Sequence, residues 1–389
     1  MLKNKTVSLV FIICIFVTGL FTAIKYQPVL FDVLKNSDAD KWSTLIEDTY
    51  PLSIAGRTDW INANGLYNKM LFRDYVEDKE TDVYRMKNGQ LIYGVDRLKD
   101  QEIEWCTEML EDFDDELSGK NIPLLYVQLP YKIKENEELL PSGCTEYANY
   151  NADMLLKAIS EKGLKSYDLR QEADEWGDNY SEHFYNTDQH WRNDTALWAA
   201  SYIAEKLHEL YGFDYEAEQY DLNNYTVKTY KDHFLGSFGK KTGVSYSGLD
   251  TYELITPNFA TSYSFTATTE VGTINRSGDF KTALLDESNL VRDLYNTNTY
   301  ETYIGGNYKL TKIVNRLNKE GSKILLIRDS FSLPMMSFLA ASYGEIDSID
   351  LRYYDDSAVE LAESGGYDAV IIAYNPSTFG DEVFYFGSE

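Results

Sequence analysis

Hydrophobic and polar positions follow two rhythms along the chain, and their order predicts the fold class. Apolar residues recur with helical spacing over residues 102–117 and 149–161. A short, mostly apolar run follows each helix, IPLLYVQLP after the first and GLKSYDLR after the second, as expected of buried strands. A third helical pattern begins near Asn193 or Asp194, either of which can cap it.

The α/β pattern is interrupted and then resumes. Residues 220–300 are rich in Thr, Ser, Tyr and Gly, with short alternating runs that predict an inserted strand-and-loop region forming one wall of a cleft. A helix is expected over 308–318, followed by an apolar strand, Lys323–Arg328, that runs into a turn and a helix starting near Pro334. Strands in IDSIDLRYY and YDAVIIAYNP complete an α/β fold with a parallel sheet flanked by helices.

The N-terminus has a different pattern. Lys3 and Lys5 precede an uninterrupted apolar run, Thr6–Ile24, which is long enough to cross a hydrocarbon core of about 30 Å as a helix. No small-residue cleavage site follows the run. We therefore expect residues 1–25 to form an uncleaved transmembrane signal anchor, with the N-terminus in the cytoplasm and the remainder outside the cell membrane.

Two further parts are expected after this anchor. Residues 26–95 form an N-terminal extracytoplasmic segment, with a short helix in RTDWINANGLYNKML and a hairpin strand in NGQLIYG. Residues 96–389 form the catalytic domain, which contains the insertion at about 220–300.

Composition excludes some partners. The net charge is -27, from 63 acidic and 36 basic residues, which disfavours binding to nucleic acid or to anionic lipid. Outside the apolar run, Cys106 and Cys144 are the only cysteines and could form a disulfide in an oxidising compartment. The chain has neither a C-x-x-C nor an H-E-x-x-H motif, so we expect no metal and no cofactor.

Candidate chemistry lies in two short motifs. In RDSFS, Ser330 stands on the sharp connection between a strand and a helix, where a nucleophile is exposed at the carboxyl edge of a sheet. A serine needs a base, and His190 in DQHW is the candidate. Asp188, two residues before it, can fold back onto the imidazole and fix its tautomer. The sequence therefore predicts a triad of Ser330, His190 and Asp188.

The pair of motifs, DQHW and RDSFS, resembles the DHHW family and the SGNH-hydrolase-like group that includes AlgX and AlgJ, the proteins of alginate O-acetylation. RTDWINANGLYNKML, LYVQLPYK, FLGSFGKKTG, IGGNYKL and DLRYY extend the resemblance over nearly all of the chain beyond residue 25. Gln189 and Arg328 depart from the family, which has histidine and often glycine at these positions.

The resemblance implies an SGNH-hydrolase-like, flavodoxin-like fold and further site residues. Gly306 and Asn307 would supply oxyanion donors, and Arg352 would hold a sugar hydroxyl or carboxylate, unless it only pairs with acidic neighbours. Tyr374 would line the cleft, and Trp191 is grouped with the substrate-binding residues.

The implied function is transfer of acetyl groups to an extracellular polysaccharide through an acyl-enzyme on Ser330. A multi-spanning membrane acyltransferase would deliver the acetyl donor, because donors must cross the membrane. Two alternatives remain open at this point: an acetyl esterase with the same triad, and a non-catalytic carbohydrate-binding or assembly protein.

Overall fold

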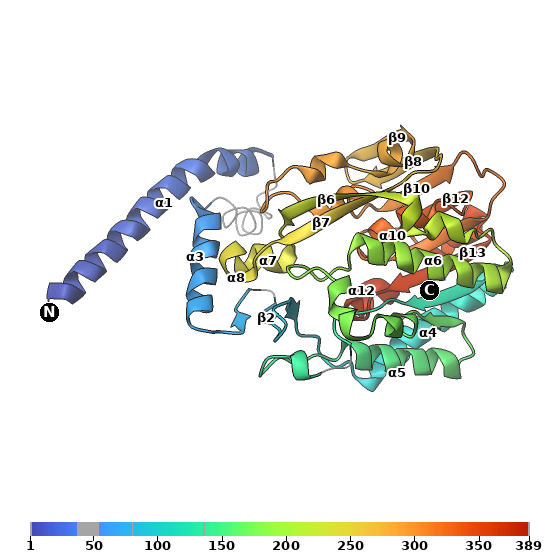
Figure 1. Cartoon of the computed structure of the whole chain (residues 1–389), viewed down its shortest axis with the longest axis horizontal. Coiled ribbons are helices and arrows are strands. Elements are labelled where there is room, and N and C mark those ends of the chain that lie inside the picture. The colour runs from blue at the N-terminus through green and yellow to red at the C-terminus, as the bar shows by residue number, and fades with distance from the viewer. Residues whose placement is uncertain (1, 37–53, 80, 135–136, 388–389) are drawn as a thin grey trace. The chain divides into compact units, whose positions relative to one another are not determined.

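The computed structural model describes residues 2–36, 54–79, 81–134 and 137–387, which fall into two compact units (Figure 1). The first unit comprises residues 1–73 and 241–246, and it contains α1 (Leu2–Asn36) and α3 (Arg57–Met70). Within the described ranges, no helix combines the length and apolar character needed to cross a membrane, so the transmembrane helix expected over 1–25 is not supported.

The second unit, residues 74–240 and 247–389, is built on an eight-stranded sheet. In spatial order its strands are β5 (Ser166–Asp168), β4 (Leu124–Gln128), β13 (Ala369–Tyr374), β11 (Lys323–Arg328), β12 (Glu345–Ile349), β10 (Leu310–Asn315), β8 (Tyr263–Thr269) and β9 (Gly272–Gly278). The first five run parallel, whereas β10, β8 and β9 pair antiparallel. The sheet is therefore mixed, not wholly parallel as predicted, because the inserted region extends one edge with a hairpin.

The segment 308–318 is a strand, not the helix expected there. In β10 the buried positions alternate at Thr311, Ile313 and Asn315, which is the period of a sheet and not of a helix. The strand lies between β12 and β8 and pairs with both of them. Its β-branched residues suit such a position.

Two hydrophobic cores cover the two faces of this sheet. Ile324 and Leu326 of β11 join the core on one face, and Leu325 and Ile327 join the core on the other. Since both faces are covered, β11 is apolar on both faces from Ile324 to Ile327, as the sequence indicated, whereas β12 also buries Asp347 and Ser348. The first core contains α6 (Asn193–Tyr211), α9 (Phe280–Leu284) and α10 (Ser332–Leu339), and the second contains α4 (Asp100–Ser118), α5 (Ala148–Glu161), α11 (Ala358–Gly365) and α12 (Asp381–Phe384).

Smaller elements complete the fold. The hairpin predicted in NGQLIYG is confirmed as part of a three-stranded sheet of β1 (Tyr75–Val76), β2 (Val83–Arg85) and β3 (Leu91–Tyr93). A separate antiparallel pair consists of β6 (Tyr225–Phe234) and β7 (Asp250–Pro257). Two short helices, α7 (Ser237–Thr242) and α8 (Val244–Ser247), follow β6. Single 3-10 turns or longer 3-10 segments span Glu137–Leu139, Glu172–His183, Ala217–Tyr220, Leu222–Asn224, Glu287–Leu290, Thr299–Thr302 and Pro376–Thr378.

The disulfide considered between Cys106 and Cys144 is not present. Cys106 is buried in the core under α4, whereas Cys144 is partly exposed, and the two are not joined by a disulfide.

Candidate active site

The nucleophile turn lies at the carboxyl edge of the sheet, between β11 and α10. Ser330 stands in this turn, and the buried carboxylate of Asp329 holds it in place. That carboxylate accepts hydrogen bonds from the backbone N–H of Phe331 (2.9 Å) and Asn375 (2.6 Å) and from the hydroxyl of Thr378 (3.0 Å). Asp329 therefore ties the turn to the end of β13, and burial raises the pKa of its carboxyl.

The structure brings the three predicted triad residues together. His190 Nε2 lies 2.7 Å from Ser330 Oγ, and His190 Nδ1 is hydrogen-bonded to Asp188 Oδ1. The loop that carries Asp188 and His190 ends at the first turn of α6, at the same edge of the sheet as Ser330. This is the relay of acid, imidazole and hydroxyl that activates a serine.

Asp188 is a buried carboxylate with several partners. Its side chain also accepts the backbone N–H groups of Ser237 (2.6 Å) and His190 (3.1 Å). Burial opposes its ionisation, but the His190 imidazole and these hydrogen bonds outweigh burial and lower the pKa of Asp188 well below its ordinary value. An ionised Asp188 keeps a proton on Nδ1 of His190, so Nε2 can accept the proton of Ser330.

Gly236 allows the chain to approach Asp188 closely. A Cβ at this position would lie 2.2 Å from Asp188 Cβ and 2.6 Å from the carbonyl oxygen of Thr187, closer than atoms can pack. The absence of a side chain lets Ser237 reach the carboxylate, and the N–H of Gly236 itself donates to Thr187 Oγ1 (2.8 Å). The FLGSFG stretch therefore packs directly against the Asp188 carboxylate.

Aromatic residues fix the base and the turn. The ring of Tyr300 stacks on His190 with 3.9 Å between centroids and 15° between planes. Its hydroxyl and the indole N–H of Trp191 both donate to the carbonyl oxygen of Phe331, each at 2.9 Å. Trp191 is fully buried, so this structure places it beneath the nucleophile turn and out of reach of a substrate in solution.

A buried arginine links the nucleophile strand to the Gly-Gly-Asn turn. The Arg328 guanidinium, fully buried, donates to Asn307 Oδ1 (2.5 Å), to Ser348 Oγ (3.2 Å) and to Asp350 (3.3 Å). Because a guanidinium only donates, it holds the oxygen of the Asn307 amide and leaves the NH₂ group of that amide available as a donor. Gly306, just before Asn307, has φ +143°, a conformation that favours glycine.

The remaining predicted residues differ in accessibility. Arg352 donates twice to the carboxylate of Asp350, at 2.8 and 2.6 Å, and its side chain is 28% exposed, so it is both ion-paired and accessible. Tyr374 is fully buried, and its hydroxyl donates to the carbonyl oxygen of Val383 (2.6 Å), away from any cleft.

Three residues near the triad were not predicted as site residues. Glu301 is half-buried, close to Gly306 and to His190, and burial raises the pKa of its carboxyl. Lys240 donates to the carbonyl oxygen of Thr297 (2.7 Å), and burial lowers the pKa of its ammonium. Lys240 contacts Thr297, 57 residues further along the chain, and Glu301 is distant in sequence from His190. A local motif therefore does not indicate either contact.

Lys132 is the third of these residues. It is buried, and its ammonium donates to the carbonyl oxygens of Leu91 (2.8 Å) and Asp188 (2.7 Å). Burial lowers its pKa to about 7, although Asp250 and Asp188 act in the opposite direction. Lys132 thus stabilises the backbone of the loop that carries Asp188 by hydrogen-bonding to its carbonyl oxygen.

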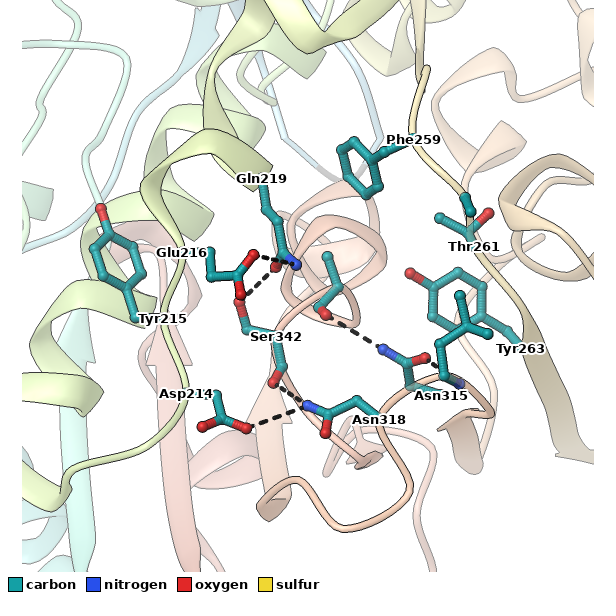
Figure 2. A pocket seen from close by; sticks show the side chains of 13 residues that line it. Asp214, Tyr215, Glu216, Gln219, Phe259, Thr261, Tyr263, Asn315, Asn318 and Ser342 are labelled. Atoms are coloured by element: carbon teal, nitrogen blue, oxygen red, sulfur yellow. Dashed lines mark hydrogen bonds between the residues drawn. The ribbon is translucent and has the colours of Figure 1, made fainter.

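A cavity of about 430 Å³ lies at the opposite edge of the sheet (Figure 2). Tyr263, at the start of β8, and Asn315, at the end of β10, lie on one side of it, with Gln219 and Ser342 on the other. Strands β11 and β12 are parallel, and Ser342 precedes β12 whereas Ser330 follows β11. The cavity and the nucleophile turn therefore lie at opposite edges of the sheet. None of the residues that line the cavity is a histidine, so it lacks the base that the triad provides.

Comparison with known proteins identifies the domain. Residues 92–292 match the family profile described as SGNH hydrolase-like domain, acetyltransferase AlgX. No curated protein sequence matches the chain.

Solved structures share the fold. Bacillus cereus PatB1, in a structure with a sulfonyl adduct, has a TM-score of 0.65 at 19% identity, over 81% of this chain and 99% of that one. A second PatB1 structure gives 0.65 at 21% identity, over 80% and 99%. A DHHW family protein from Eubacterium siraeum gives 0.59 at 22% identity, over 80% and 96%.

Substitution of Gly236 tests the acid site. In Gly236→Ala the new methyl group displaces Asp188 or the Ser237 N–H, so we expect hydrolysis of p-nitrophenyl acetate to fall about a hundredfold in kcat/KM. Gly19→Ala is the control, because a Cβ there meets no atom within 4 Å. Equal rates in the two variants would contradict the role of this close approach.

Lys132 predicts a pH dependence of stability. The native ammonium loses its proton at about pH 7, whereas in the unfolded chain it does so near pH 10.4, so between these values the unfolded state binds more protons. The contribution of Lys132 to stability therefore rises with pH in this window. We expect the difference in free energy of unfolding between wild type and Lys132→Met to grow from pH 7 to 9 by up to about 1.4 kcal/mol per unit.

Urea unfolding at several pH values measures this difference. Lys134→Met, at a side chain that is 45% exposed, is the matched control. A difference that stays constant with pH would argue that Lys132 titrates as an ordinary lysine.

Proposed function

The chain belongs to the family of SGNH hydrolase-like acetyltransferase domains of the AlgX type, and on this premise we propose that it acetylates hydroxyl groups of a polysaccharide through an acyl-enzyme on Ser330. The single observation that carries the proposal is the 2.7 Å contact between His190 Nε2 and Ser330 Oγ, with Asp188 on the other imidazole nitrogen. A protein that only binds sugars has no need of this relay, which disfavours a non-catalytic role.

The cycle has two halves, and in each of them His190 first accepts a proton and then gives it up. His190 takes the proton of Ser330 as the hydroxyl oxygen attacks the acetyl carbonyl, and it returns that proton to the departing donor group. A sugar hydroxyl then gives its proton to His190 and attacks the acyl-enzyme. Release of the acetylated sugar returns the proton to Ser330 Oγ. Hydrolysis is the same cycle with water in place of the sugar.

Oxyanion stabilisation is assigned to the turn and to Asn307. The N–H groups of Phe331, Ser332 and Leu333 already donate within the turn, so the proposed oxyanion donors are the backbone N–H of Ser330 and the side-chain NH₂ of Asn307. Arg328 orients the Asn307 amide for that task. Removal of one such donor typically lowers kcat about 10²- to 10³-fold.

We also place the catalytic unit outside the cytoplasm, where a cell-surface or secreted polysaccharide is found. Lys3 and Lys5 followed by the apolar run Thr6–Ile24 support export. Acetyl donors are made inside the cell, so this location requires a membrane partner that passes the acetyl group across, and a multi-spanning acyltransferase fits that requirement.

Ser330→Ala tests the mechanism directly. With p-nitrophenyl acetate as donor, we expect release of p-nitrophenol to fall about a thousandfold, and the mass increase of one acetyl group on the wild-type chain to disappear. Ser332→Ala is the matched control, because the Ser332 side chain is buried next to the turn and its hydroxyl has no partner among the described residues. Serine-independent release would refute the acyl-enzyme. Release to water with no acetylated sugar would support an esterase.

The location has its own test. A fusion of alkaline phosphatase to the C-terminus is expected to be active in whole cells and inactive once residues 2–25 are deleted, because the phosphatase folds only after export. Activity that survives the deletion, or inactivity of both fusions, would place the unit elsewhere.

A further inference from the structure

A second cavity, of about 750 Å³, lies at the same edge of the sheet as the triad. We call it the β12 cavity, because Leu351, Arg352 and Tyr354, which follow β12, form one wall. Trp105 of α4 and Tyr385, just after α12, form others. Its volume lies within the range of about 300 to 1,000 Å³ that is typical of sites for small organic ligands.

Strand register places one wall residue of this cavity, Arg352, beside the nucleophile turn. Ile327 of β11 pairs with Ile349 of β12 in the parallel ladder, and Ser330 and Arg352 each follow three residues later. Neighbouring strands lie about 4.8 Å apart, so the two residues leave the sheet side by side. The ion pairs from Arg352 to Asp350 and from Asp350 to Arg328 connect the cavity wall to the strand that carries the nucleophile.

The lining suits a sugar ring. Three aromatic side chains, Trp105, Tyr354 and Tyr385, offer flat faces on which the C–H face of a sugar can pack, and Tyr385 is 58% exposed without a covering group among the described residues. Arg352 adds donors beside them. Aromatic faces together with a few fixed polar groups are the mix that orients a ligand with both apolar and hydroxyl surfaces.

Charge narrows the class of sugar. Asp355, Asp356 and Glu382 also line the cavity. Lys309 pairs with Asp355, but within the described part of the chain Asp356 and Glu382 have no cationic partner. Asp350 pairs with both Arg328 and Arg352, so this trio keeps one positive charge against the two carboxylates of Asp356 and Glu382. An anionic sugar would thus meet uncompensated carboxylates in a protein of net charge -27.

We propose that the β12 cavity is the acceptor subsite and that it takes a glycan whose sugar units carry no carboxylate, either neutral or amino sugars. The assignment rests on the proposed acetyl transfer, and it excludes polyuronates such as alginate as the acceptor of this chain.

The test separates binding from chemistry. Binding of cellotetraose, of the tetramer of glucosamine and of tetragalacturonate is measured by calorimetry on the full chain carrying Ser330→Ala, which cannot turn over. We expect the first two to bind and the uronate not to. Adding Trp105→Ala or Tyr385→Ala is expected to weaken binding about tenfold. Trp60→Ala, at a side chain that is 51% exposed on α3, is the matched control and should bind as before.

A gain of binding is the second arm. Asp356→Lys combined with Glu382→Lys reverses the uncompensated charge, so tetragalacturonate should then bind while the glucosamine tetramer weakens. On the wild-type nucleophile, transfer of acetyl from p-nitrophenyl acetate should show a raised KM for the acceptor in Tyr385→Ala, with kcat changed less.

The outcomes distinguish this inference from the proposed function. Serine-dependent transfer with acceptor binding unaffected by Trp105→Ala and Tyr385→Ala overturns the subsite and leaves the enzyme assignment intact. Binding of none of the three tetramers, or of tetragalacturonate alone, also overturns it. Sugar binding that depends on Trp105 and Tyr385, with no effect of Ser330→Ala on acetyl release, keeps the subsite and overturns the acyl-enzyme.

Discussion

A buried negative charge determines how the catalytic edge is built. The Asp188 carboxylate is only 3% exposed, and a buried carboxylate without partners is costly enough to become protonated. It stays ionised because the imidazole of His190 and two backbone N–H groups surround it. Each partner depends on another contact. The Ser237 N–H reaches the carboxylate only because Gly236 has no side chain, and the imidazole plane is held by stacking on the ring of Tyr300. Disturbing any of these affects the base, and through it the nucleophile.

A buried positive charge at the same edge of the sheet is also stabilised by an oppositely charged neighbour. Arg328 is completely buried beside the nucleophile turn, where an uncompensated guanidinium would be unfavourable, and Asp350 compensates it. Asp350 in turn pairs with Arg352 at the surface. Arg328, which departs from the glycine of many relatives, also donates to Asn307 and Ser348 from Nε and one terminal nitrogen, while its other terminal nitrogen has no partner among the described residues. The charge in the turn is therefore part of a chain of ion pairs that reaches solvent.

The sequence anticipated the triad because its signals are local. Asp188 and His190 are two residues apart, and a serine between a buried strand and a helix marks the carboxyl edge of an α/β sheet. Contacts across the fold could not be read in this way. Lys132 is buried under a loop 56 residues away in the chain, and Gly236, just after β6, meets Asp188, which lies 48 residues earlier. Tyr374 and Trp191 were placed in the cleft by their motifs, but the structure buries both.

Strand β10 was predicted as a helix for a related reason. In residues 310–315 the apolar residues do not lie on one face, and the alternation of burial appears only because β8 and β12 pair with this strand and the first hydrophobic core covers one of its faces. Tertiary pairing therefore decided the secondary structure here.

All eight residues of α10, the helix that directly follows the nucleophile, are buried. Ser330, the proposed nucleophile, is consequently attached directly to the core, so a change that loosens the core there also displaces Ser330 from His190. The β12 cavity is lined largely by side chains at the surface. If the β12 cavity binds the acceptor as proposed, substitutions at this rim can change the glycan that is recognised and leave the buried core under the triad unchanged.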